Sequence, residues 1–166
     1  MNLFILRHGI AEECVLPDFD DANRKLTAKG RSRLKKITAA MRKMELSFDL
    51  ILTSPYLRAA QTAQIVANEL KLKKQLQTAD ELMPDGNVKK LIARVTKLKP
   101  APRNLLLVGH EPCLSQLIAL LVGGNDKAAI DLKKGGLGKL ELKSLSFGRC
   151  ATLAWLLTPK QMELMT

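Results

Sequence analysis

The sequence predicts an α/β domain of three layers, in which a mostly parallel central sheet carries helices on both faces. Three observations support this prediction. The chain has 166 residues, a length typical of one domain. Short apolar runs alternate along it with amphipathic stretches of helical spacing. The connections between these segments are short, and strands that alternate with helices in this way favour a parallel sheet. We therefore treat residues 1–166 as a single domain.

The first half of the chain predicts two strands and two helices. Residues 2–6 form a compact apolar run, as a buried strand does, and residues 49–53 form a second one. Between them, apolar residues recur at helical spacing over residues 31–45. Pro55 stands where a helix can begin, because its fixed φ suits the first turn. The residues that would form the apolar face of this helix are Ala59, Ala63, Val66 and Leu70.

The middle of the chain repeats the pattern. A weaker strand is expected at residues 75–79, a helix at 88–98 and a third clear strand at 104–108. Another helix follows, which the pair Gly123-Gly124 closes. Its apolar face would consist of Leu114, Leu117, Ile118 and Leu121.

The end of the chain differs from the rest. Residues 137–142 and 151–157 predict two strands separated by a turn near Gly148, and a short helix is expected after Pro159. If the two strands form a hairpin, the sheet is mixed rather than purely parallel.

The composition limits the partners and the compartment. Lys and Arg number 27 and Asp and Glu 16, so the net charge is +11, which favours an anionic partner. Aromatic residues make up only 4%, too few to stack many bases, so we expect no nucleic-acid partner. No apolar stretch reaches the length of a membrane span, and we expect no membrane partner. The three widely spaced cysteines, Cys14, Cys113 and Cys150, encode no disulfide framework or zinc ribbon and fit a reducing, cytoplasmic location.

Both histidines of the chain follow expected strands. His8 stands in Arg7-His8-Gly9 after the first strand, and His110 stands in Gly109-His110-Glu111 after the third clear one. The second strand is followed by a segment that contains Arg58. Because the carboxyl ends of parallel strands gather at one edge of a sheet, two histidines and two arginines are expected to meet there.

This set of residues predicts phosphoryl transfer. Arginine binds phosphate oxygens in a bidentate way, and imidazole is a competent nucleophile and acid–base group near neutral pH. The alternative is that both histidines are only buried and hydrogen-bonded. We expect no cofactor and no metal. Asp18, Asp20 and Asp21 resemble a calcium loop only superficially, because the glycine and the distal glutamate of that loop are absent.

Four segments in order resemble the histidine phosphatase superfamily, which includes phosphoglycerate mutases, acid phosphatases and small SixA-type phosphohistidine phosphatases. They are Leu6-Arg7-His8-Gly9, Leu26-Thr27-Ala28-Lys29-Gly30, Thr53-Ser54-Pro55 with Leu57-Arg58-Ala59 and Gln61-Thr62-Ala63, and Val108-Gly109-His110. The resemblance extends from the first strand to residue 112 and implies a phosphoglycerate mutase-like fold.

The resemblance also implies roles for single residues. His8 would be the nucleophile that accepts the phosphoryl group, and Arg7, Arg58 and His110 would form the phosphate pocket. Gly9 would keep the turn after the first strand open for close approach of the substrate. The carboxylic acid that protonates the leaving group would be Glu81, with Glu111 as the alternative; we prefer Glu81. A solvated surface carboxylate is the other interpretation of Glu81.

The short connection between Glu81 and Val88 leaves little chain to roof the site, and this compact layout resembles the SixA type. The expected substrate is therefore a phosphohistidine on a protein, such as a histidine phosphotransfer domain in signal transduction. A small phosphoester substrate and a non-catalytic polyanion-binding module are the alternatives. The oligomeric state is left open.

Two basic segments have no assigned role. Lys and Arg residues recur along the first long helix and the helix after residue 88, as a solvated outer face or as a docking surface for an acidic phosphoprotein. They are Arg31, Arg33, Lys35, Lys36, Arg42 and Lys43, and then Lys89, Lys90, Arg94, Lys97 and Lys99. An acidic patch follows His8, made of Glu12, Glu13, Asp18, Asp20 and Asp21.

Overall fold

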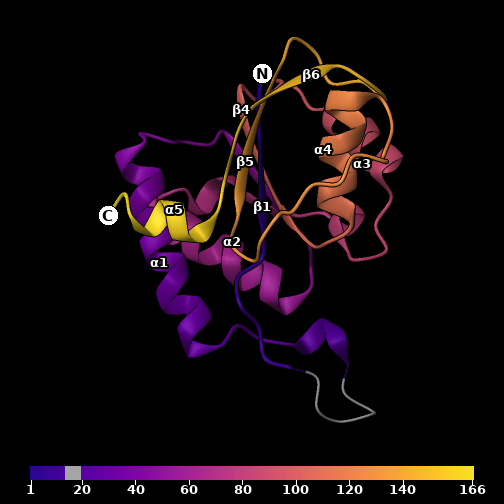
Figure 1. Ribbon diagram of the computed structural model, residues 1–166. Helices are drawn as coiled ribbons and strands as arrows, with labels where there is room; N and C mark the ends of the chain where they lie inside the picture. Colours follow the sequence, from indigo (N-terminus) through magenta and orange to yellow (C-terminus); the bar gives the residue numbers. More distant parts are fainter. Residues whose placement is uncertain (14–19) are drawn as a thin grey trace.

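The computed structural model describes residues 1–13 and 20–166, and it confirms the three-layer α/β architecture (Figure 1). The central sheet has six strands in the order β3-β2-β4-β1-β5-β6. Strands β1, β2, β3 and β4 run parallel, whereas β5 pairs antiparallel with β1 and β6 antiparallel with β5. The expected final hairpin is therefore present, and the sheet is mixed. The strands are β1 (Asn2–Arg7), β2 (Leu50–Thr53), β3 (Leu76–Thr78), β4 (Asn104–Gly109), β5 (Leu137–Leu142) and β6 (Ala151–Leu157).

Helices cover both faces of the sheet (Figure 1). Because successive strand side chains point to opposite faces, Phe4 and Leu6 pack with one helical layer, and Leu3 and Ile5 pack with the other. The first layer consists of α1 (Ala28–Lys43), α2 (Leu57–Glu69) and α5 (Pro159–Glu163). The second consists of α3 (Val88–Thr96) and α4 (Cys113–Gly123). Three short 3₁₀ turns complete the chain: η1 (Asp21–Asn23), η2 (Lys73–Gln75) and η3 (Asp80–Leu82).

Two helix starts differ from the sequence prediction. Helix α1 begins at Ala28, before the expected residue 31, because the Thr27 hydroxyl accepts the Gly30 N–H at 2.9 Å and caps the first turn. A Cβ at Gly30 would overlap the Ile10 carbonyl oxygen, so the glycine lets the helix start against the loop after β1. Helix α2 begins at Leu57 rather than at Pro55.

The carboxyl ends of β1, β2 and β4 are level. Arg7 pairs with Gly109 in the register of β1 and β4, and Thr53 pairs with Val108 in that of β2 and β4. The loops that follow these strands therefore leave the sheet at the same height, as expected for a ligand-binding edge.

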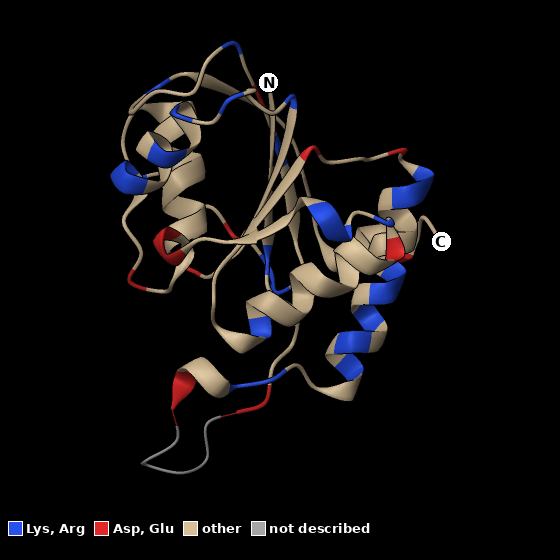
Figure 2. Cartoon of the chain, turned by 180° about the vertical axis from the view of Figure 1, so that it is seen from behind, with Lys and Arg blue, Asp and Glu red and all other residues tan. Residues whose placement is uncertain are grey.

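Basic residues are concentrated along α1 (Figure 2). Two of them have carboxylate partners: Arg33 pairs with Glu163 at 3.0 Å and Arg42 with Glu69 at 3.4 Å. Within the residues described, no helix combines the length and the apolar character needed to span a bilayer.

Candidate active site

Both histidines and both arginines predicted for the site meet at the level edge of the sheet. The His8 and His110 rings lie with their centroids 5.1 Å apart, and both side chains are buried. Arg58, from the first turn of α2, is buried as well, whereas Arg7 at the end of β1 is half-buried. The topology thus brings together residues that are up to 103 positions apart in the sequence (Arg7 to His110).

The hydrogen bond of His8 determines its tautomer. Nδ1 of His8 lies 2.7 Å from the Gly9 carbonyl oxygen. A carbonyl can only accept, so Nδ1 carries the proton and Nε2 has a free lone pair. Burial lowers the pKa of His8 to about 3, and the positive charges of Arg58 and Arg7 lower it further. His8 is therefore neutral at physiological pH and presents an unprotonated nitrogen.

His110 is neutral for similar reasons. Burial, followed by the charge of Arg58, lowers its pKa to about 4. Its Nε2 lies 2.9 Å from the Ser54 hydroxyl, which also accepts the Tyr56 N–H at 3.2 Å. Since the Ser54 oxygen is already an acceptor, its own proton is available to Nε2, and we assign the ring proton of His110 to Nδ1.

Arg58 is held by an acidic residue. Its two terminal nitrogens donate to the Asp21 backbone oxygen at 2.8 Å and to Asp21 Oδ2 at 2.9 Å. Its guanidinium also lies 5.2 Å from the centre of the Tyr56 ring. Partial burial alone would raise the pKa of Asp21, but the hydrogen bonds and charges of Arg58 and Arg24 outweigh it and lower the pKa. Asp21 is thus an anion in direct contact with a site arginine.

Arg7 is held by the backbone instead. One of its terminal nitrogens donates to the Leu132 carbonyl oxygen at 2.9 Å. The backbone of the same turn is bound to β1, because the Gly135 N–H contacts the Arg7 carbonyl oxygen at 3.0 Å and the Arg7 N–H donates to Gly136 at 3.1 Å. Gly135 has a φ of +82°, a left-handed conformation that favours glycine.

Unpartnered polar atoms are concentrated at this edge. Across the described residues, three buried side-chain nitrogens lack a hydrogen-bond partner: Arg7 Nε, Arg58 Nε and His110 Nδ1. A buried donor without a partner costs about 1–3 kcal/mol. All three belong to the residues around His8, so the site has hydrogen-bonding capacity that the fold does not use.

Comparison with known proteins identifies the family. Residues 3–83 match the model of the histidine phosphatase superfamily (branch 1). An uncharacterised protein of Picosynechococcus is 37% identical over 139 residues, which cover 82% of each chain. Phosphohistidine phosphatase SixA of Escherichia coli K12 is 30% identical over 125 residues, or 75% of this chain and 76% of the relative. The chain belongs to the histidine phosphatase superfamily.

A solved structure of the protein histidine phosphatase SixA complexed with tungstate has the same fold. It superposes with a TM-score of 0.82 at 27% identity and covers 96% of this chain and 98% of its own. The resemblance to the SixA type is therefore confirmed over nearly the whole chain, including the part after residue 112 that the sequence motifs did not reach. The chain is accordingly a phosphatase of this superfamily.

The two candidate acids make other contacts. Glu81, in η3, forms an ion pair with Arg94 of α3 at 3.0 Å, and Arg94 also donates to the Thr78 carbonyl oxygen. Its carboxylate is thus mostly buried and paired with a cation, unlike a solvated surface carboxylate, and its role as the general acid remains a prediction. The Glu111 carboxylate accepts the Ser115 N–H at 3.0 Å in the first turn of α4. The structure brings together His8, His110, Arg7 and Arg58, while both acids are held by neighbouring groups.

Gly9 has a packing role. A Cβ at this position would lie 2.7 Å from Leu34 Cδ1, so the Leu34 side chain would have to shift to make room for a side chain here. The close approach of a substrate to Gly9 remains a prediction. The Gly9 N–H donates to the Thr62 hydroxyl at 3.0 Å, and that hydroxyl donates to the Arg58 carbonyl oxygen at 2.7 Å.

Sequence reasoning missed three residues of the site: Asp21, Ser54 and Thr62. The sequence pattern could have indicated Thr62, since it is a polar residue on the apolar face of α2 and lies four positions after Arg58. Asp21 had only its place in the acidic patch, whose purpose the sequence did not indicate. Cys14 and Asp18 lie outside the described residues.

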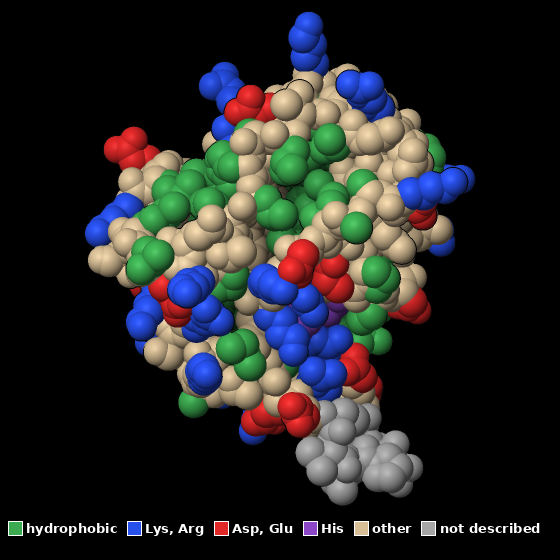
Figure 3. Space-filling model, viewed as in Figure 1, with side chains coloured by type: hydrophobic (Ala, Val, Ile, Leu, Met, Phe, Trp, Pro, Cys, Tyr) green, Lys and Arg blue, Asp and Glu red, His purple; other side chains and the backbone are tan. Residues whose placement is uncertain are grey.

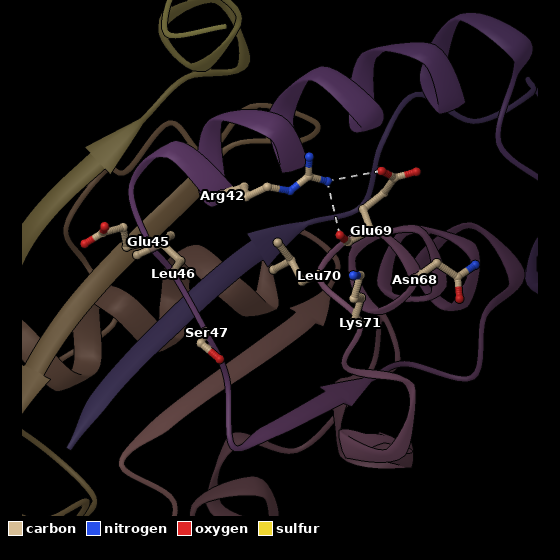
Figure 4. Close-up of a pocket in the computed structure, with 8 residues that line it drawn as sticks. All are labelled: Arg42, Glu45, Leu46, Ser47, Asn68, Glu69, Leu70 and Lys71. Carbon is tan, nitrogen blue, oxygen red and sulfur yellow. Dashed lines mark hydrogen bonds and ion pairs between the residues drawn. The ribbon is translucent and has the colours of Figure 1, made fainter.

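Features elsewhere are not connected with these side chains. No group of three or more His, Cys, Asp or Glu able to hold a metal occurs among the residues that the structure covers, and independence from metal remains a prediction. A pocket of about 740 Å³ lies between the C-terminal ends of α1 and α2, where Arg42 contacts Glu69 (Figure 4). It contains none of the four site residues.

Proposed function

We propose that the chain is a phosphohistidine phosphatase, which removes the phosphoryl group from a histidine of another protein through a covalent intermediate on His8. The observation that carries this proposal is the set of unpartnered donors on Arg7, Arg58 and His110 beside a neutral His8 with a free Nε2. A phosphoryl group between them would receive hydrogen bonds from all three residues while His8 attacks.

The reaction has two balanced steps. In the first, the Nε2 lone pair of His8 attacks phosphorus, the P–N bond to the substrate histidine breaks, and the departing imidazole nitrogen keeps the electron pair and takes up a proton. In the second, a water oxygen attacks phosphorus and releases a proton to solvent, and the bond to His8 breaks with its electron pair returning to Nε2. Arg7, Arg58 and His110 stabilise the equatorial oxygens in both steps.

Three arguments favour a P–N bond on a protein over a small phosphoester. The curated relative at 30% identity is a phosphohistidine phosphatase, and the related structure holds tungstate, an oxyanion of phosphate shape. Only residues 83–87 connect η3 to α3, so this connection adds little chain that could hinder a large substrate. An imidazole with a pKa of about 6.5 leaves more easily than an alkoxide, so the reaction depends less on an acid such as Glu81.

Labelling tests the nucleophile. Brief incubation with a ³²P-labelled phosphodonor, followed by denaturation in base, should leave an acid-labile label on the protein, because phosphohistidine is stable in base and labile in acid. His8→Ala should abolish both the label and turnover. Normal turnover by His8→Ala, with circular dichroism equal to wild type, would reject His8 as the nucleophile.

A substrate panel tests the specificity. We expect kcat/KM to be higher for a phosphohistidine phosphotransfer domain than for sugar phosphates or nucleotides. Glu81→Gln should slow phosphoester hydrolysis by about tenfold or more and phosphohistidine hydrolysis by much less, since general acid catalysis contributes most to the poorer leaving group. Arg94→Gln is the matched control, because it releases Glu81 and keeps the carboxyl group. A sugar phosphate or nucleotide that outperforms every phosphohistidine protein would contradict the proposed substrate class.

A further inference from the structure

A pocket of about 560 Å³ adjoins the site on the side of Arg7. It lies between the end of β1, the start of α1, the turn before β5 and the start of α5. Figure 3 shows Lys and Arg side chains gathered next to a histidine on this face of the molecule. The lining residues are Arg7, Ile10, Arg33, Lys133, Lys134, Thr158, Pro159 and Lys160.

The pocket carries an excess of positive charge. Five of its eight residues are cationic. Arg33 pairs with Glu163, and Lys133 pairs with Asp131. Within the described part of the chain, Arg7, Lys134 and Lys160 have no carboxylate partner. Three cations from three separate elements therefore face a common space in which an anion would be stabilised.

The elements that carry these cations are fixed relative to His8. The Gly135 N–H lies 3.1 Å from the His8 carbonyl oxygen as well as 3.0 Å from that of Arg7, so the turn that carries Lys133 and Lys134 is bound directly to the end of β1. The start of α5 is held by a capping box between Thr158 and Gln161, and its end by the pair of Glu163 with Arg33. The charges are thus preorganised beside the nucleophile.

We propose that this pocket, which we call the Arg7 pocket, binds acidic side chains that flank the phosphohistidine on the partner protein. The inference rests on the proposed function. The volume of the Arg7 pocket is in the range of roughly 300–1,000 Å³ typical of ligand sites and exceeds what one phosphate group fills. Ile10 and Pro159 offer apolar contact to the methylene groups of Asp or Glu side chains. Arg7 lines the Arg7 pocket and also belongs to the phosphate site beside His8. An acidic residue in the pocket would therefore lie next to the phosphoryl group.

Charge reversal at the two lysines outside the catalytic set tests the proposal. In Lys134→Glu/Lys160→Glu we expect kcat/KM for a phosphohistidine phosphotransfer domain to fall about tenfold or more, because two favourable contacts become repulsive. Turnover of p-nitrophenyl phosphate should stay within about twofold of wild type, since a small substrate does not reach the pocket. Retained turnover of this substrate also shows that the variant is folded. Lys73→Glu/Lys74→Glu in η2 is the matched control, with the same change in net charge at exposed positions outside the pocket.

The outcomes separate this inference from the function on which it rests. An equal loss in both double variants would show a general charge effect and reject the pocket, as would an unchanged kcat/KM in Lys134→Glu/Lys160→Glu. A selective loss for a small bisphosphorylated substrate would assign the pocket to a second phosphate and also reject it as a site for acidic side chains. If the wild-type chain hydrolyses p-nitrophenyl phosphate but no phosphohistidine domain, the proposed function itself fails.

Discussion

The two arginines of the site are held in opposite ways. Arg58 is buried on α2, and both of its terminal nitrogens bind Asp21, a residue with an ionised side chain. Arg7 is half-buried at the end of β1, and one terminal nitrogen binds the neutral Leu132 carbonyl. The two guanidinium groups are equal in charge, but among the residues that the structure describes only Arg58 pairs with a carboxylate.

This difference separates two tasks within one phosphate pocket. An anion that binds Arg58 through its terminal nitrogens competes with the Asp21 carboxylate, which is itself about half exposed. An anion that binds Arg7 displaces no carboxylate of residues 1–13 and 20–166. The charge of Arg58 also lowers the pKa of both histidines more than the charge of Arg7 does. Arg58 therefore lowers the pKa values of the histidines more than Arg7 does. Its terminal nitrogens are also less available to an incoming anion.

Removal of each arginine gives the largest expected effect. Arg58→Ala should lower kcat/KM by about 10²- to 10⁴-fold, or roughly 3–6 kcal/mol for two charge-assisted hydrogen bonds. Arg7→Ala should cost less, because Arg58→Ala also removes one of the two arginine partners of the Asp21 carboxylate and leaves it with Arg24 alone. Adding Asp21→Asn should therefore restore more of the activity of Arg58→Ala than of Arg7→Ala, in which it only frees the Arg58 nitrogens from their carboxylate partner. Steady-state kinetics on a phosphohistidine substrate measure all four variants, and equal rescue in both backgrounds would contradict this account.

The histidines between the arginines predict a dependence of stability on pH. Their pKa values in the fold are about 3 for His8 and about 4 for His110, below about 6.5 in an unfolded chain. The unfolded chain therefore binds more protons between about pH 6.5 and 4, and the stability contributed by these residues is complete above pH 6.5 and is lost as the pH falls through this window.

Two protons taken up on unfolding correspond to a slope of up to about 2.7 kcal/mol per pH unit. Urea unfolding at a series of pH values measures it. His110→Gln removes one of the two groups and should reduce the slope by about half. A slope that is unchanged in this variant would show that other groups cause the acid sensitivity.

The smallest expected effect isolates the ion pair of Arg58. Asp21→Asn should strengthen inhibition by inorganic phosphate by about two- to fivefold, since a half-exposed ion pair contributes up to about 1 kcal/mol. Asp20→Asn is the matched control, because Asp20 caps the neighbouring η1 turn and its carboxylate contacts Ala22 and Asn23 instead of Arg58. Identical inhibition constants in wild type and Asp21→Asn would mean that phosphate does not compete with Asp21.

Local pattern was sufficient to predict the architecture and the four central residues. The apolar runs that became β1, β2 and β4 are short and bounded by polar residues, and the parallel sheet places whatever follows them at one edge. His8 and His110 were found in this way, and so was the loop that leads to Arg58. The motifs around them added the family.

The contacts that tune the site depend on side-chain pairs that local pattern does not contain. The pairing of Asp21 with Arg58 spans 37 positions and depends on how the η1 turn folds back over α2. The pairing of Glu81 with Arg94 depends on the angle between η3 and α3. In the same way, the Leu34 side chain behind Gly9 became visible only once α1 was placed against β1.

The Thr62 hydroxyl connects the two segments that carry His8 and Arg58. It accepts from Gly9 and donates to the first turn of α2, so one atom joins the loop after β1 to the helix. Release of the loop breaks the bond from Gly9, and fraying of that helical turn breaks the bond to Arg58. Because both bonds share the Thr62 oxygen, we expect the two motions to be coupled in one local opening event. In hydrogen exchange, the Gly9 amide should thus report the rate at which the Arg58 segment opens.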